Sequence, residues 1–182
     1  MKFTASRIPD VVIIEPVVHE DRRGFFMETW RESNYKEAGI EAAFVQDSHS
    51  RSSYGGLRGL HYQVNKPQGK LVRVIQGEVF DVAVDLRKSA ATFGQWSCEI
   101  LSAANRKLMW IPPGFAHGFL VLSEFAEFTY RCTDYYAPQH ERTLRWDDPD
   151  VAIDWPLRKD QVPILSGKDL RGVSLGDAQT YA

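Results

Sequence analysis

The sequence predicts an all-β protein of sandwich or barrel type. Short segments with the length of strands and a β-branched or aromatic content recur along the chain, at residues 11–14, 71–75, 79–86, 108–111, 118–122 and 126–130. Turn signals separate them, at residues 54–56, 76–78, 93–94 and 112–114. A helix is predicted only over residues 31–43, with Ser33 and Asn34 as capping residues.

Length and charge limit the possible partners. The chain has 182 residues without a low-complexity linker or an internal repeat, so we expect one domain over residues 1–182. A net charge of -2 provides no basic field that would attract nucleic acid or an anionic membrane. An anionic ligand would therefore need a local cluster of cationic side chains.

The expected compartment follows from hydropathy and cysteine use. No run approaches the ~18 apolar residues of a membrane helix, and the first residues, Met1 to Thr4, lack the apolar stretch of a signal peptide. Cys98 and Cys132 form no C-x-x-C pair, which indicates free thiols that serve as small core residues. We predict a soluble cytoplasmic protein.

Two carboxylates interrupt the apolar segment 79–86. A period of two places Asp81, Ala83 and Asp85 on one face of a strand and Val82 and Val84 on the other. Such a polar face either lines a binding site inside a barrel or is solvated outside it. The same carboxylates either support a site residue or pair with a nearby arginine, Arg73 or Arg87.

Polar residues concentrate in three further stretches, at residues 46–53, 57–70 and 112–119. The second and third resemble the two cupin motifs. Gly55, His61 and Gly77 have the spacing of the first motif, and the third stretch, from Pro112 to His117, matches Pro-x-Gly-x-x-His. The motif's second histidine is replaced by Gln63, and its glutamate position is occupied by Lys70.

These replacements change the chemistry of the site. A metal cupin needs imidazole and carboxylate ligands that converge on one cation, and a protonated lysine repels a divalent metal and cannot coordinate it. We therefore expect no metal. Lys70 is instead suited to stabilise a developing oxyanion.

An oxyanion stabiliser beside a histidine suggests proton abstraction next to a carbonyl. Epimerisation requires a base, an acid across the ring and an electrophile, and the ordinary pKa of histidine, about 6.5, makes His61 a suitable base. Tyr130 lies on a predicted strand and is a candidate acid. The sequence pattern alone identifies it weakly, because the chain has seven tyrosines.

The chain is similar to the dTDP-4-dehydrorhamnose 3,5-epimerase family from residues 21–28 to 165–169, most specifically at residues 57–63, 69–72 and 113–119. This resemblance implies a cupin jelly roll with a few short helices that acts as a homodimer without metal or cofactor. It implies inversion of C3 and C5 of dTDP-4-dehydro-6-deoxy-D-glucose to give dTDP-4-dehydro-L-rhamnose, in dTDP-L-rhamnose biosynthesis.

The resemblance also implies roles for individual residues. His61 is expected to be the base, Asp169 its partner, Tyr130 the opposing proton donor and Lys70 the group that steadies the enolate. Lys70 is also expected to contact the substrate, together with residues that would bind the nucleotide sugar: Arg23, Glu28, Gln46, Asp47, Ser48, Arg58, His117, Glu141 and Lys168, with Tyr136 stacked on the thymine. In the implied dimer, the segment with Arg23 and Glu28 is expected to reach a neighbouring site.

Other functions remain open at this point. A related cupin would epimerise only C3 or C5, or isomerise a keto sugar, with the same base, acid and electrophile. A further alternative is a cupin that binds a sugar nucleotide without catalysis, which is disfavoured by the combination of His61, Tyr130 and Asp169. Another is a metal-dependent cupin oxygenase, which is disfavoured by Lys70 and Gln63.

Several conspicuous residues have ordinary structural interpretations. His19, His49 and His140 belong to no motif and are expected to be surface or structural residues. Trp110 and Phe115 are expected in the core. His117 either binds the substrate or holds loops together by hydrogen bonds.

Overall fold

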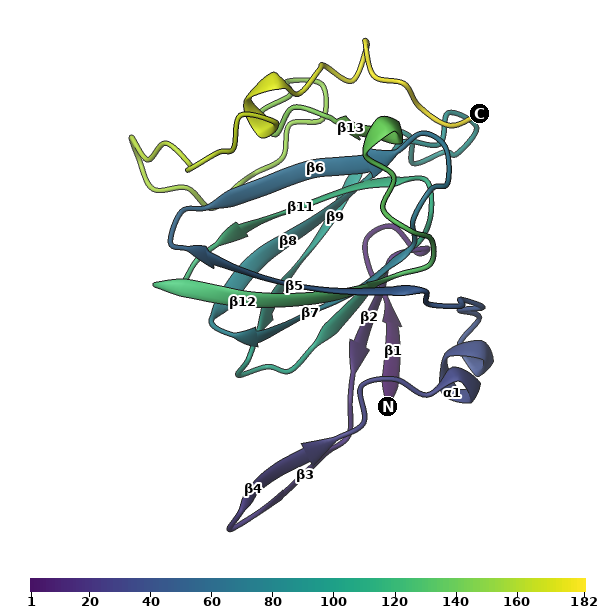
Figure 1. The fold of residues 1–182 in the computed structure, drawn as a ribbon, viewed down its shortest axis with the longest axis vertical. Helices are drawn as coiled ribbons and strands as arrows, with labels where there is room; N and C mark the ends of the chain where they lie inside the picture. The colour runs from purple at the N-terminus through teal and green to yellow at the C-terminus, as the bar shows by residue number, and fades with distance from the viewer.

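A computed structural model describes all 182 residues and shows two antiparallel sheets packed face to face (Figure 1). The six-stranded sheet has the order β1-β2-β10-β7-β12-β5, with bounds Lys2–Ala5, Val12–Glu15, Leu108–Ile111, Lys70–Gln76, Phe125–Cys132 and Gln46–Ser53. The five-stranded sheet has the order β13-β6-β11-β8-β9, with bounds Glu141–Thr143, Leu57–Gln63, Phe115–Val121, Glu78–Asp85 and Trp96–Ser102. This architecture is the predicted cupin jelly roll.

The main core lies between the sheets. Fifteen buried side chains form it, among them Val72, Met109 and Phe128 from the six-stranded sheet and Ala83 and Phe119 from the other. Full burial of a large apolar side chain contributes about 1.5–3 kcal/mol, so this layer holds the sheets together. The six predicted strands correspond to β2, β7, β8, β10, β11 and β12, and their inward faces supply most of this core.

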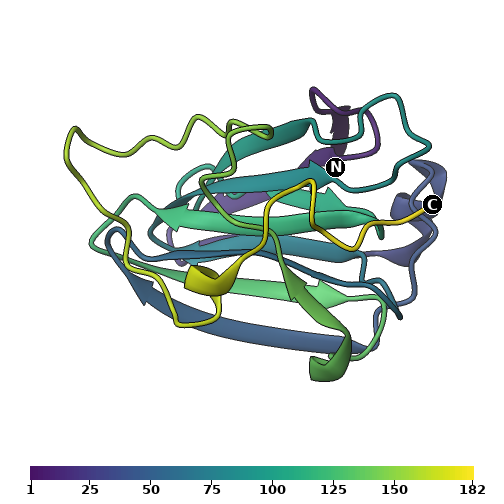
Figure 2. The same cartoon turned by 90° about the horizontal axis from the view of Figure 1, so that it is seen from above.

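A second core lies on the outer face of the five-stranded sheet. There Val82 and Val84 of β8 pack beneath the chain that follows β13, including Trp155. Figure 2 shows this C-terminal segment crossing the sheet. Ala83, between the two valines, faces the other core, so the predicted alternation along β8 is confirmed. The segment carries the short 3₁₀ helix η2, Asp169–Arg171, to the edge of β6.

The helix prediction was wrong in length. The helix α1 spans only Glu32–Glu37, its N-cap residue is Arg31, and no side chain caps it. It ends because Gly39 adopts a left-handed conformation with φ of +81°. The residues beyond pack instead as an irregular segment, in which Phe44 meets Trp30 edge to face. No helix of the protein is both long and apolar enough to cross a membrane.

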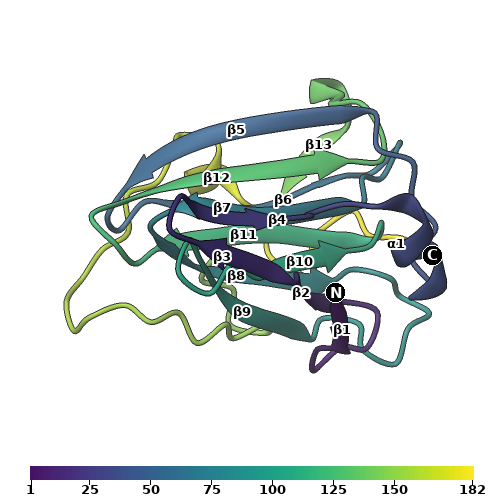
Figure 3. The same ribbon diagram turned by 90° about the horizontal axis from the view of Figure 1, so that it is seen from below.

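A two-stranded hairpin projects from the body of the molecule (Figure 1) and lies in front of the sheets in the view from below (Figure 3). It consists of β3, Val18–Asp21, and β4, Gly24–Met27. Its apolar side chains are largely uncovered, with Phe25 56% and Phe26 72% exposed. A second 3₁₀ helix, η1 at Pro138–His140, directly precedes β13.

Candidate active site

A cavity of about 340 Å³ lies between the two sheets and receives side chains from both. His61 enters it from β6 of the five-stranded sheet, whereas Lys70 on β7 and Tyr130 on β12 enter it from the six-stranded sheet. The remaining side chains that line it are Gln46, Ser48, Ser50, Arg58, Gln68, His117, Phe119, Phe128, Tyr136, Glu141 and Lys168. The base and the acid expected from the sequence therefore face one space from opposite layers.

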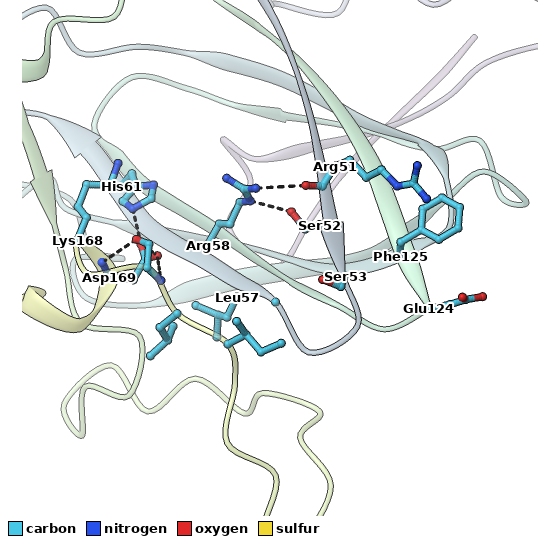
Figure 4. A pocket seen from close by; sticks show the side chains of 14 residues that line it. Arg51, Ser52, Ser53, Leu57, Arg58, His61, Glu124, Phe125, Lys168 and Asp169 are labelled. Carbon is cyan, nitrogen blue, oxygen red and sulfur yellow. Dashed lines mark hydrogen bonds and ion pairs between the residues drawn. The ribbon is translucent and has the colours of Figure 1, made fainter.

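His61 is oriented by a carboxylate that is distant in the sequence. Its Nε2 lies 2.6 Å from Oδ1 of Asp169, which the C-terminal segment delivers to β6 (Figure 4). A carboxylate only accepts hydrogen bonds, so Nε2 carries the hydrogen and Nδ1 keeps its lone pair. Asp169 is itself fixed by the backbone N–H groups of Gly59 and Ser166, at 3.2 and 3.0 Å, and by the Ser166 hydroxyl at 2.5 Å.

A glycine allows β6 to pass close to β11 at this point. Gly59 has a φ of +128°, and a Cβ built there would lie only 2.6 Å from Cα of Gly118 and 2.8 Å from the carbonyl oxygen of His117. The register between the two strands also shifts between His117 and Phe119. The glycine thus places the Gly59 N–H toward Asp169 while His61 faces the cavity.

The environment favours a neutral His61 and an ionised Asp169. Burial lowers the pKa of His61, the Asp169 hydrogen bond opposes this, and the cationic Lys168 and Lys70 lower it further. Burial alone would raise the pKa of Asp169, but hydrogen bonds from His61 and Ser166 hold it well below its usual range. A neutral imidazole next to an ionised carboxylate can accept a proton.

Lys70 and Tyr130 lie on adjacent strands of the opposite sheet. Burial lowers the pKa of Lys70, and the nearby Glu141 and Asp81 carboxylates counteract that effect. Burial raises the pKa of Tyr130, which keeps its phenol protonated. The site therefore combines a proton acceptor on His61, an N–H donor on Lys70 and a protonated phenol on Tyr130.

His117 belongs to a second histidine–carboxylate pair. Its Nε2 lies 3.0 and 3.1 Å from the two oxygens of Asp81, and both side chains are buried. Of the two alternatives for Asp81, a position inside the barrel or a solvated position outside it, the first is therefore correct. Asp85 instead accepts hydrogen bonds from Arg87 and Thr92, while Arg73 pairs with neither carboxylate. No three histidine, cysteine, aspartate or glutamate side chains lie close enough together to hold a metal ion.

Polar side chains from the C-terminal half form one rim of the cavity. The hydroxyl of Tyr136 donates to Glu141 at 2.9 Å, and the ammonium of Lys168 donates to the other oxygen of Glu141 at 2.7 Å. Burial would raise the pKa of Glu141, but the hydrogen bonds from Lys168 and Tyr136 outweigh it and lower the pKa. Tyr136 remains half exposed at the edge of the cavity.

Three residues expected at the site lie elsewhere in the single chain. Asp47 points away from the cavity, because alternation along β5 turns Gln46 and Ser48 inward, and it pairs with Arg131 at 3.4 Å. Arg23 is at the tip of the β3–β4 hairpin and binds Asp21, and Glu28 follows the hairpin and binds Arg31. Neither of these last two side chains reaches this cavity.

The structure adds residues that the sequence reasoning missed. Ser50, Phe119 and Phe128 line the cavity, and period-two alternation from Ser48, His117 and Tyr130 would have indicated them. Gln68 lines it from the loop before β7, where no periodic signal exists. The expectations for Trp110 and Phe115 are confirmed, since both are buried in the core.

A larger and more open hollow of about 870 Å³ adjoins the cavity at His61, Arg58 and Lys168 (Figure 4). Arg58 reaches across it to the Ser52 hydroxyl at 2.7 Å. Arg58 and Lys168 thus place two cationic side chains beside His61, which is the local positive cluster that a nearly neutral chain needs for an anionic ligand.

Fold and site together define a cupin-type isomerase. A family model described as dTDP-4-dehydrorhamnose 3,5-epimerase matches residues 5–177. The chain belongs to this family.

Individual relatives agree along the whole chain. The dTDP-4-dehydrorhamnose 3,5-epimerase of Pseudomonas aeruginosa is 57% identical over 182 residues, which cover 100% of this chain and 99% of that protein. A Legionella pneumophila epimerase, solved in complex with dTDP-4-keto-L-rhamnose, is 51% identical with a TM-score of 0.94 and coverage of 98% and 94%. A 3'-monoepimerase from Streptomyces bikiniensis, solved with dTDP-quinovose, is 33% identical with a TM-score of 0.86 and coverage of 93% and 85%.

Proposed function

We propose that this cavity converts dTDP-4-dehydro-6-deoxy-D-glucose to dTDP-4-dehydro-L-rhamnose, the double epimerisation of dTDP-L-rhamnose biosynthesis, with His61 as base, Tyr130 as acid and Lys70 as electrophile. The observation that supports it best is the placement of His61 and Tyr130 on opposite sheets around one cavity. Inversion needs a proton to leave one face of a carbon and another to arrive on the opposite face.

The reaction proceeds through an enolate at each carbon. Nδ1 of His61 takes the proton next to the C4 ketone, and the electron pair of the broken C–H bond moves onto the ketone oxygen. The Lys70 ammonium stabilises this negative charge. The enolate then takes the phenolic proton of Tyr130 at the same carbon from the opposite face, and solvent later reprotonates Tyr130 and deprotonates His61.

The nucleotide would occupy the rim. A half-exposed Tyr136 ring offers a face for stacking on thymine, and the Arg58 guanidinium is suited to a diphosphate. Gln46, Ser48, His117, Glu141 and Lys168 line the same cavity and supply further polar contacts.

A homodimer would complete the site. Arg23 and Glu28 lie on or next to a projecting hairpin that carries the exposed Phe25 and Phe26, and they do not reach the cavity of their own chain. We propose that this hairpin packs against a second copy and that Arg23 and Glu28 contact the ligand there.

The two thiols support a reducing compartment. Cys98 and Cys132 are both free, and Cys132 is fully buried. We propose that the enzyme works in the cytoplasm.

Deuterium incorporation tests the proposed reaction. The purified enzyme is incubated in D₂O with dTDP-4-dehydro-6-deoxy-D-glucose, and the label at C3 and C5 is quantified by NMR. Label with inversion at both carbons supports double epimerisation. Label at C3 alone would favour the activity named for the Streptomyces bikiniensis relative, and persistence of exchange in His61→Ala would require another base.

A further inference from the structure

The loop that carries Tyr136 is held by three glutamine side chains. Residues 133–137 lie between β12 and η1 and form neither helix nor strand. The Gln46 carboxamide oxygen accepts from the Tyr136 N–H at 2.8 Å, and the Gln68 carboxamide donates to the Asp134 carbonyl at 2.8 Å. The third glutamine, Gln63, is 3% exposed and does not line the cavity.

Gln63 bonds to the backbone on both sides of Tyr136. Its Oε1 accepts from the N–H of Ala137 at 2.8 Å, and its Nε2 donates to the carbonyl of Tyr135 at 3.3 Å and to that of Lys66 at 2.8 Å. One buried carboxamide therefore fixes the residues immediately before and after the stacking candidate. A side chain without these polar atoms would leave three backbone groups unpaired.

The position of Gln63 makes this use notable. In the cupin motif it corresponds to the second histidine, a metal ligand in metal cupins, and it ends the strand that carries His61. Its amide does not point at the cavity but ties β6 to the loop of Tyr136. Gln63 thereby couples β6, the strand of the proposed catalytic base His61, to Tyr136, the residue proposed to stack on thymine.

We propose that Gln63 is a positioning residue that sets nucleotide affinity by fixing the ring of Tyr136 through the flanking backbone. The proposal rests on the proposed function in taking Tyr136 as the nucleotide-stacking residue. Gln63 touches no reacting atom, so its loss should weaken binding of the nucleotide while the chemical step at saturation stays intact. A residue that served only global stability would change neither affinity nor KM in protein that is still folded.

The experiment compares Gln63→Met with Asn105→Ala. Methionine preserves the shape of the glutamine, whereas Asn105 is a matched control because its carboxamide also makes three backbone hydrogen bonds, to Ser102, Lys107 and Ile100, away from the cavity. We expect Gln63→Met to raise the Kd for dTDP, measured by calorimetry, and the KM for the sugar nucleotide by about tenfold, with kcat within about twofold. Asn105→Ala should change neither constant.

A double variant tests the route through Tyr136. In a Tyr136→Ala background, Gln63→Met should add no further loss of dTDP affinity, since the ring to be positioned is gone. An unchanged Kd in Gln63→Met, a loss confined to kcat, or additive losses in the double variant would overturn the proposal. The binding readout needs no turnover, so failure of the proposed reaction would show separately, as absence of deuterium uptake by the wild-type enzyme.

Amide hydrogen exchange on the wild-type protein gives an independent measurement should Gln63→Met fail to fold. The Ala137 amide should be protected before any ligand is added, because Gln63 already binds it. Rapid exchange of this amide in the free enzyme would show that the clamp is not preformed and would refute the proposal.

Discussion

Replacing Asp169 by asparagine should weaken the base without emptying the cavity. Oδ1 accepts from His61 and the Gly59 N–H, and Oδ2 accepts from the N–H and hydroxyl of Ser166. Asparagine has one oxygen, so its NH₂ group meets an N–H donor on whichever side it faces. If it faces His61, the imidazole must direct the lone pair of Nε2 toward it and place its hydrogen on Nδ1, which removes the proton acceptor from the substrate side.

The expected magnitude follows from the hydrogen bond that is lost. A hydrogen bond to a charged group contributes about 1.5–3 kcal/mol, which corresponds to about 10- to 160-fold in rate at 1.36 kcal/mol per tenfold. The assay is the rate of deuterium incorporation at C3 and C5 from pH 4.5 to 8. Asp148→Asn is the matched control, because Asp148 is also a buried carboxylate that accepts backbone N–H groups, from Asp150, Val151 and Leu175.

The pH profile distinguishes a weakened base from a loosened fold. His61 must be neutral to accept a proton, and burial lowers its pKa, so the wild-type rate should fall only when the pH drops below about 6.5. The Asp169 hydrogen bond raises this pKa, so in Asp169→Asn the acid limb should move to still lower pH while the plateau falls. A plateau within twofold of wild type, or an acid limb displaced upward, would refute this account of His61.

Four further outcomes are expected. Lys70→Met should lower kcat by about 10²–10³-fold while dTDP binding stays measurable, because a transition-state interaction is lost; an unchanged kcat would remove Lys70 from the mechanism. Tyr130→Phe should still exchange substrate protons for deuterium through His61 but invert the carbons at least about 10²-fold more slowly, as judged by NMR. Gly59→Ala should lower the free energy of unfolding by roughly 2–6 kcal/mol in a urea titration, because its Cβ would meet Gly118 at 2.6 Å and its φ is +128°. Treatment with EDTA followed by gel filtration should leave the rate unchanged, and activity that returns only with a divalent ion would contradict a metal-independent site.

The strands that could be predicted from the sequence are those with apolar residues on one face or on both. Strands such as β8 and β10 were predicted because one face or both are apolar. β5, Gln46–Ser53, consists of polar residues throughout, because one face includes cavity residues and the other is exposed, and eight backbone pairings with β12 define it instead. Such a strand is stabilised by its hydrogen bonds to the neighbouring strand, so its own sequence shows no hydrophobic periodicity.

The site divides in a similar way. Motif spacing alone singles out His61, Lys70 and His117, since these residues lie within short stretches. Asp169 is 108 positions from His61 and becomes its partner only because the C-terminal segment crosses the outer face of the five-stranded sheet. The role of Gln63 was also inaccessible, because the motif identifies it as a missing ligand but does not show which backbone groups its amide binds.

The proposed mechanism uses one set of groups for two carbons. C3 and C5 both flank the C4 ketone, so in the proposed mechanism the Lys70 ammonium would stabilise the enolate formed from either side. The two sheets place His61, the proposed proton acceptor, and Tyr130, the proposed proton donor, on opposite sides of the same cavity, so the architecture would separate removal and return of a proton. We expect the choice between inversion at one carbon and at both to depend on how the sugar ring fits in the cavity, which Phe119 and Phe128 also line. Substitutions at these two phenylalanines should therefore change the ratio of C3 to C5 labelling before they abolish exchange.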